Sequence, residues 1–129
     1  MAQASTDDPR KLRDLFHRTR ELAGSHEITS VVVGLAGGDG DLLFPEFVTF
    51  LESALRVEDS IFRMTRDRAV AFLTDVSCAG AAEIVGRLRQ DFAQRFPATE
   101  ALQLRVGFFE VPAGSRNVTA KEILPAVFS

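Results

Sequence analysis

The chain has 129 residues, of which 46% are hydrophobic and 26% are charged, and its net charge is −3. This length and composition predict a single folded domain, residues 1–129, with a sizeable hydrophobic core. The acidic balance argues against a non-specific nucleic-acid binder, because such proteins carry a broad basic surface.

Two further features limit the class of protein. Cys78 is the one cysteine, which excludes an internal disulfide and a thiolate metal cluster and fits a reducing cytosol. No apolar run approaches the roughly 20 residues that span a bilayer, and the N-terminus lacks a secretory signal pattern. We therefore expect a cytoplasmic protein without a membrane span, with residues 1–6 disordered.

The first part of the chain predicts a helix, a strand and a second helix. Asp8 and Pro9 have the form of an N-cap and a first helical position, and Gly24 is expected to end that helix in a left-handed cap. The β-branched run 28–35 is typical of a central strand that is covered on both faces. After the glycine-rich loop 37–41, apolar residues recur at helical spacing: Phe47, Phe50, Leu51, Ala54 and Leu55.

The middle of the chain predicts a hairpin followed by a third helix. Residues 60–64 and 69–73 are short apolar strands, and the polar run 65–68 between them has the length of a tight connection. Cap candidates for the third helix lie at 74–77, and Pro97 is expected to close it.

The last part of the chain predicts a strand and a short helix. Apolar and other residues alternate from Leu102 to Phe109, and Thr119 to Glu122 has capping-box form. The order of elements is then β-α-β-β-α-β with a helix added at each end. This order predicts an α+β, ferredoxin-like or palm fold, with an antiparallel sheet and helices on one of its faces.

Several residues with chemical potential have ordinary structural explanations. His17 and His26 lack a partner at a useful spacing, so surface roles are favoured over catalysis. Cys78 lies near a helix N-terminus, which lowers a thiol pKa, but no basic residue accompanies it. The loop 37–41 offers two carboxylates where a divalent cation wants about six oxygens, which favours a plain turn over a metal site.

Arg56 and Asp59, just before the hairpin, form a stronger candidate site. An arginine fork can donate to the O6 and N7 edge of guanine, and a carboxylate can accept from its N1–H and amino group. The pair could therefore bind a guanine base. The alternative is a surface ion pair, which contributes little to stability.

The segment around this pair resembles the signature region of the GGDEF family, the diguanylate cyclases. Arg56 to Asp59 corresponds to the RxxD motif of that family, five residues follow, and Thr65 to Ala69 stands at the GGDEF turn. The family's opening motif, D-x-LTGLPNRR-x-F, is similar to DDPRKLRDLF here, with several positions changed. The family's fourth strand resembles LRVGFFEVP, and the start of its late helix matches TAKEIL. The resemblance covers nearly the whole chain.

The departures from the family concern catalysis. Gly34 stands where the family has a magnesium-binding aspartate, Thr65 and Arg66 replace both turn glycines, and Arg68 replaces the second acidic residue, which leaves Asp67 alone. Two-metal phosphoryl transfer needs several carboxylates. The resemblance therefore implies a degenerate domain that is no enzyme and needs no metal or other cofactor.

The inhibitory site of the family, by contrast, is retained in sequence. The resemblance implies a cyclic di-GMP site formed by Arg56, Asp59 and Arg87, and Arg63 and Arg89 are nearby charges that could reach phosphates. Our first hypothesis is a receptor for cyclic di-GMP, bound as a stacked dimer of the ligand. The second is a bacterial signalling domain that binds a protein partner or forms a homodimer and binds no nucleotide. GTP binding at the degenerate turn, through Asp67, is a third.

Overall fold

The computed structural model describes residues 6–38, 41–96, 103–115 and 118–128. In these ranges the chain forms, in order, α1 (Pro9–Ser25), β1 (Ser30–Ala36), α2 (Leu43–Ala54), β2 (Ser60–Thr65), β3 (Arg68–Thr74), α3 (Cys78–Arg95), β4 (Arg105–Val111) and α4 (Ala120–Val127). The order that the hydrophobic patterning predicts is confirmed, as is the α+β class.

The four strands make one antiparallel sheet with the order β2-β3-β1-β4. β1 lies between β3 and β4, and all seven of its residues are buried. The prediction that this β-branched segment is a central strand is therefore confirmed.

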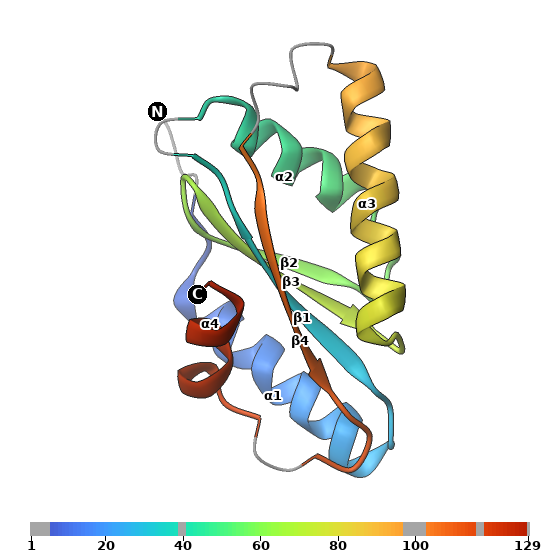
Figure 1. Ribbon diagram of the computed structural model, residues 1–129. Helices are drawn as coiled ribbons and strands as arrows, with labels where there is room; N and C mark the ends of the chain where they lie inside the picture. Colours follow the sequence, from blue (N-terminus) through green and yellow to red (C-terminus); the bar gives the residue numbers. More distant parts are fainter. Residues whose placement is uncertain (1–5, 39–40, 97–102, 116–117, 129) are drawn as a thin grey trace.

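Helices cover both faces of the sheet, as Figure 1 shows. α2 and α3 pack on the face to which Val31 and Val33 point, whereas α1 and α4 share a core cluster with Val32 on the other face. The predicted single-face arrangement holds for the two helices of the β-α-β-β-α-β core, α2 and α3, and the added terminal helices α1 and α4 cover the opposite face. Because β1 is apolar on both sides, each face of the sheet needs an apolar cover.

The structure also corrects one helix end. α1 begins after the predicted N-cap Asp8, but it continues past Gly24, and the left-handed backbone conformation belongs to Glu27, with φ of 53°. Gly24 instead faces the loop after β4, where a Cβ atom would lie 3.6 Å from the carbonyl oxygen of Ser115. A Cβ atom would fit at this distance, and the glycine does not end the helix.

Other predicted boundaries are confirmed or fall outside the described ranges. Ser77 caps α3, and Thr119 caps α4 by accepting a hydrogen bond from the amide of Glu122. Pro97 and residues 1–5 lie outside the described residues. In the part of the chain that the structure describes, no helix has both the length and the apolar character needed to cross a bilayer.

A pair of glycines brings α4 close to the sheet. Gly34 of β1 lies opposite Gly107 of β4. A Cβ atom on Gly34 would lie 2.6 Å from the carbonyl oxygen of Val127 in α4, and one on Gly107 would meet the same oxygen. The end of α4 therefore occupies the space that side chains at both positions would need.

We predict that Gly107→Ala lowers the free energy of unfolding by about 1–3 kcal/mol, because the added methyl group overpacks the contact with α4. Gly86→Ala is the control. No atom lies within 4 Å of a Cβ at Gly86 in α3, and alanine in a helix interior is favoured over glycine by up to about 1 kcal/mol. Urea unfolding measures both variants. Equal stabilities would contradict this placement of α4.

Candidate functional site

The candidate site lies on the tight turn between α2 and β2. Leu55 caps α2 in an extended conformation, and the amide of Asp59 then donates to the carbonyl oxygen of Arg56 at 3.0 Å. This hydrogen bond closes a β-turn whose central residues are Val57 and Glu58. Both are exposed, and Val57 is 99% exposed, so the turn presents an outer surface that the fold itself does not use.

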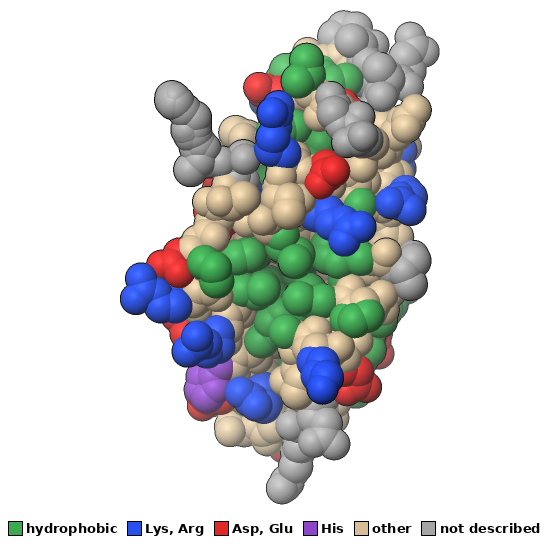
Figure 2. Space-filling model, turned by 90° about the vertical axis from the view of Figure 1, so that its left-hand side faces the viewer, with side chains coloured by type: hydrophobic (Ala, Val, Ile, Leu, Met, Phe, Trp, Pro, Cys, Tyr) green, Lys and Arg blue, Asp and Glu red, His purple; other side chains and the backbone are tan. Residues whose placement is uncertain are grey.

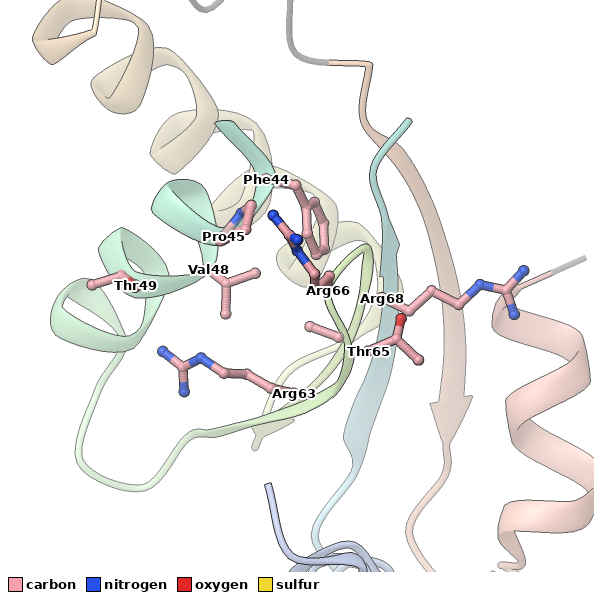
Figure 3. A pocket seen from close by; sticks show the side chains of 9 residues that line it. Phe44, Pro45, Val48, Thr49, Arg63, Thr65, Arg66 and Arg68 are labelled. Atoms are coloured by element: carbon pink, nitrogen blue, oxygen red, sulfur yellow. The ribbon is translucent and has the colours of Figure 1, made fainter. Parts of the chain in front are cut away.

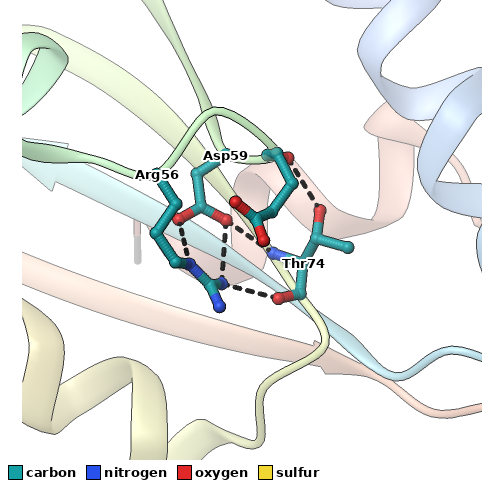
Figure 4. Close-up of polar contacts among 4 residues, drawn as sticks. Arg56, Asp59 and Thr74 are labelled. Atoms are coloured by element: carbon teal, nitrogen blue, oxygen red, sulfur yellow. Dashed lines mark hydrogen bonds and ion pairs between the residues drawn. The ribbon is translucent and has the colours of Figure 1, made fainter.

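Arg56 and Asp59 form a two-pronged ion pair within this turn (Figure 4). Nε of Arg56 lies 2.8 Å from Oδ2 of Asp59, and Nη2 lies 3.0 Å from Oδ1. The end of β3 joins the pair, because Nη2 also donates to the carbonyl oxygen of Thr74 at 2.7 Å, and the amide of Thr74 donates to Oδ1 at 3.0 Å. The pair thus ties the turn to β3.

The burial of the two side chains differs. The side chain of Asp59 is 1% exposed, whereas that of Arg56 is 43% exposed. The hydrogen bonds that Arg56 donates to Asp59 raise the pKa of the Arg56 guanidinium, although its partial burial opposes this. Asp59 therefore neutralises Arg56, as the alternative to a ligand site expects, although the carboxylate of this pair is buried and only the guanidinium reaches the surface. A buried carboxylate needs its partners, and Arg56 and Thr74 supply them.

This geometry limits what each group can offer to a ligand. Both oxygens of Asp59 accept hydrogen bonds from the protein, and Nε and Nη2 of Arg56 are committed to Asp59 and Thr74. Among the described residues, none hydrogen-bonds Nη1 of Arg56. That nitrogen carries two N–H groups. Arg56 therefore presents one donor nitrogen outward, and Asp59 holds it in place.

Arg87 lies on the exposed side of α3. It lies nine residues beyond Cys78, about 14 Å along the helix axis at 1.5 Å per residue. Among the described residues, no hydrogen bond or ion pair joins it to Arg56 or Asp59. Arg89 is also exposed. The structure thus leaves Arg87 and Arg89 open to solvent and does not connect them to the turn.

Arg63 has a different environment from the one that the sequence indicates. Its guanidinium forms a two-pronged ion pair with Glu52 of α2, at 2.9 and 3.1 Å. The pair raises the pKa of Arg63 and lowers that of Glu52. Arg63 is therefore committed to fixing α2 against β2 and is less available for phosphates than Arg87 or Arg89.

Sequence reasoning missed Thr74. It was a candidate cap for α3, but that role belongs to Ser77, and Thr74 instead contacts both Arg56 and Asp59 through its backbone. Its hydroxyl also donates to the carbonyl oxygen of Glu58 at 3.1 Å. No local pattern signals these contacts, because any residue type has the same backbone groups.

The other end of the hairpin holds the turn that the sequence aligns with the GGDEF motif. Only Arg66 and Asp67 lie between the strands, and the β2–β3 register shifts between Arg63 and Thr65. The hydroxyl of Thr65 donates to Oδ1 of Asp67 at 2.7 Å. Across the described ranges, no group of three or more His, Cys, Asp or Glu side chains could hold a metal ion.

The other residues singled out in the sequence have structural partners. Asp41 accepts hydrogen bonds from the amides of Leu43 and Gln103, at 2.9 and 3.2 Å, and so secures the start of α2. Burial, with the nearby charge of Glu110, raises the pKa of Cys78, which is the opposite of an activated thiol.

The two histidines lie on the surface. Nε2 of His17 lies 2.9 Å from a carboxylate oxygen of Glu21, one turn along α1. His26 is exposed at the end of α1. Neither residue contacts the candidate site through a hydrogen bond or ion pair in the described structure.

We predict that Asp59→Ala lowers the free energy of unfolding by about 1–3 kcal/mol, because the substitution removes the buried partner of Arg56 and of the Thr74 amide. Glu58→Ala is the matched control, since its exposed side chain should change stability by less than about 0.5 kcal/mol. Denaturant unfolding of both variants measures the difference. If Asp59→Ala is as stable as Glu58→Ala, the carboxylate does not hold the turn.

Comparisons with known proteins agree with this architecture. No family model matches the sequence, and no curated protein matches it. Among solved structures, the GGDEF domain of FimX from Pseudomonas aeruginosa matches with a TM-score of 0.73 at 13% identity, over 97% of this chain and 90% of that one.

Two other similar structures are parts of longer chains from Pseudomonas aeruginosa. PelD, solved in complex with c-di-GMP (cyclic di-GMP), matches with a TM-score of 0.69 at 24% identity, over 91% of this chain and 44% of that one. The diguanylate cyclase SiaD, solved with its activator SiaC, matches with a TM-score of 0.74 at 18% identity, over 95% and 52%. The chain spans about half of each. At these identities the likeness establishes the architecture, and the fold of this chain is that of a GGDEF domain.

Proposed function

We propose that this chain is a signalling domain that binds cyclic di-GMP and has no cyclase activity. The observation that carries the proposal is the preorganised guanidinium of Arg56, which the buried Asp59 and the end of β3 hold, while Nη1 has no hydrogen-bond partner among the described residues. The complex of PelD with the same ligand supports it, since a chain of this fold can hold that ligand.

The chemistry of the ligand matches what the turn offers. Guanine presents O6 and N7 as acceptors on one edge, and each phosphate carries a negative charge. Nη1 of Arg56 donates to such an acceptor, while the exposed side chain of Val57 offers apolar surface beside it. Because the guanidinium is already fixed, binding costs little side-chain entropy.

Arg87 is the second cation of the proposed site. It and Arg56 are on separate elements without a direct contact, so a ligand with two bases and two phosphates would bridge them. The exposure of Arg87 leaves its fork available for a two-pronged contact. In this proposal Asp59 positions Arg56 and contacts the ligand little, because its carboxylate is buried.

Two features at the Arg66–Asp67 turn of the β2–β3 hairpin support the proposed absence of cyclase activity. Asp67 is the one acidic residue of the turn, and its carboxylate accepts from the Thr65 hydroxyl. The end of α4 fills the space that a side chain at Gly34 would need. A pair of metal ions needs several carboxylates around it.

A second candidate function is protein interaction. β4 is an edge strand of the sheet, and Phe108 and Phe109 on it are half-buried. Figure 2 shows hydrophobic side chains gathered in the middle of one face, with Lys and Arg side chains around them. Unpaired strand edges and apolar patches favour association. A stable dimer in light scattering without ligand would support this function.

We predict that calorimetric titration with cyclic di-GMP gives saturable binding to the purified chain at tens of micromolar protein. Arg56→Ala and Arg87→Ala should each weaken binding by at least about tenfold, because each removes a charge-assisted contact. Arg18→Ala, an exposed arginine on α1, is the matched control and should bind like the wild type.

Unfolding curves of the variants separate loss of contact from loss of fold. No heat from the wild type, or equal binding by Arg56→Ala and the wild type, would overturn the proposal.

A separate prediction concerns catalysis. The chain incubated with GTP and Mg²⁺ should form no cyclic di-GMP at any protein concentration, because the turn lacks carboxylates for two metal ions. Chromatography of the nucleotides measures the product. Product whose amount rises in proportion to the protein would show that the turn is a working active site.

A further inference from the structure

An apolar surface lies between α1 and α4, the two helices that share one face of the sheet. It is formed by partly exposed side chains that pack against the core cluster of this face, namely Leu12 of α1, Met64 of β2, Leu124 of α4 and Phe128 at the end of α4. The left-hand side of Figure 1, where α1 and α4 lie, faces the viewer in Figure 2, and hydrophobic side chains gather in the middle of it. We call these four residues the apolar centre.

Basic side chains of α1 border the apolar centre. Arg13 and Arg20 lie three residues before and four residues after Phe16, whose ring packs edge-on against Phe72 of β3 with 5.1 Å between the centroids. Residues at these spacings share one side of a helix, so the two arginines flank the point at which α1 meets the sheet. Both are exposed. α1 therefore contributes two positive charges beside an apolar contact.

Two further cations border the centre from α4 and β3. Lys121 is exposed and lies one turn before Leu124 on α4. The guanidinium of Arg68 lies over the ring of Phe128, 5.2 Å from its centroid. In Figure 3 the side chain of Arg68 points away from α2, toward the face that α1 and α4 cover. The basic border of the apolar centre thus consists of Arg13, Arg20, Arg68 and Lys121.

The basic border is not neutralised by the protein. In the described parts of the chain, none of its four residues forms a hydrogen bond or ion pair with a carboxylate. α1 carries five Arg or Lys residues and two acidic residues, whereas the whole chain has a net charge of −3. This face is therefore positive on an acidic protein, which attracts an acidic partner and orients it toward the apolar centre.

The shape of the surface favours a helix as its occupant. The four cations are exposed, whereas the apolar centre is only partly exposed, so the charged groups stand further out than the apolar ones. A flat membrane would meet the charges before the apolar side chains, but a helix can enter between α1 and α4. In a two-fold dimer through this face the cations would lie opposite their own copies, and like charges repel.

We propose that this surface docks an amphipathic helix of another protein, with acidic residues on both sides of its apolar stripe. The stripe packs on the apolar centre, and the acidic residues pair with the basic border. This proposal rests on the protein-interaction function and gives it a class of partner. It does not involve Arg56, Asp59 or Arg87, so it does not depend on cyclic di-GMP binding.

The test uses three labelled peptides of about 18 residues, which is five helical turns. The first has leucines at i, i+3, i+4 and i+7 spacing with glutamates on both sides of the stripe. The second has lysine in place of each glutamate, and the third has the composition of the first in an order without a stripe. Fluorescence anisotropy with the purified chain should give a dissociation constant on the order of 10–100 µM for the first peptide and at least about tenfold weaker binding for the other two.

Amide shifts of the ¹⁵N-labelled chain locate the bound peptide. The glutamate peptide should shift the amides of Leu12, Met64 and Leu124, which come from the three elements around the apolar centre. The amides of Phe108 and Phe109 on the edge strand β4 should stay in place, because that edge is a different surface for association.

A pair of double variants separates the basic border from charge in general. Arg13→Gln combined with Lys121→Gln should weaken binding of the glutamate peptide by about fivefold or more, because each removes a charge at the border. Arg18→Gln combined with Arg89→Gln is the matched control. It makes the same change in net charge at exposed positions on the outer side of α1 and on α3, and it should bind the peptide like the wild type.

Equal binding of the glutamate and lysine peptides, equal weakening by the two double variants, or shifts confined to β4 would each overturn the proposal. Sedimentation with phosphatidylglycerol vesicles that the border variant loses would assign the surface to a membrane instead. A dimer that only the border variant loses would assign it to a second copy of the chain. A dimer that both double variants keep, without peptide binding, would overturn this docking site and leave the protein-interaction function in place.

Discussion

The buried carboxylate of Asp59 is the interaction on which the candidate site depends. A charge that is 1% exposed must be paired and hydrogen-bonded, and its partners come from two places in the chain, Arg56 in the same turn and Thr74 at the end of β3. One side chain therefore fixes how α2 leads into the sheet. The same bonds orient Arg56, so that the stability of the turn and the position of its guanidinium have a common origin.

The two ends of the β2–β3 hairpin have different chemistry. At one end an exposed turn carries the guanidinium of Arg56, whose Nη1 has no hydrogen-bond partner in the described part of the chain. At the other, Arg66 and Asp67 connect the two strands, and α4 closes on the glycine pair Gly34 and Gly107. Among the described residues, no group of three or more His, Cys, Asp or Glu side chains could hold a metal ion at either end.

Much of the fold follows from local patterns. The caps Asp8 and Thr119 and the doubly apolar strand β1 define their elements through nearest neighbours, so they can be predicted from the sequence. The sequence also pairs Arg56 with Asp59, which are one turn apart. The role of Thr74 could not be predicted from the sequence, because Thr74 contacts the pair through backbone groups that every residue type has. The Glu52–Arg63 ion pair could not be predicted either, because its partners are on different elements. The packing of α4 on two glycines likewise depends on distances across the sheet.

The central claim is that Arg56 is held ready by Asp59 and meets the ligand with its remaining nitrogen. A crystal structure of the chain with cyclic di-GMP tests this most directly. The account predicts that Nε and Nη2 of Arg56 stay on Asp59 and Thr74 while Nη1 donates to a guanine or phosphate oxygen, with Arg87 on the same ligand. A complex in which Arg56 makes no contact with the ligand, or in which its contacts with Asp59 are broken, would contradict it.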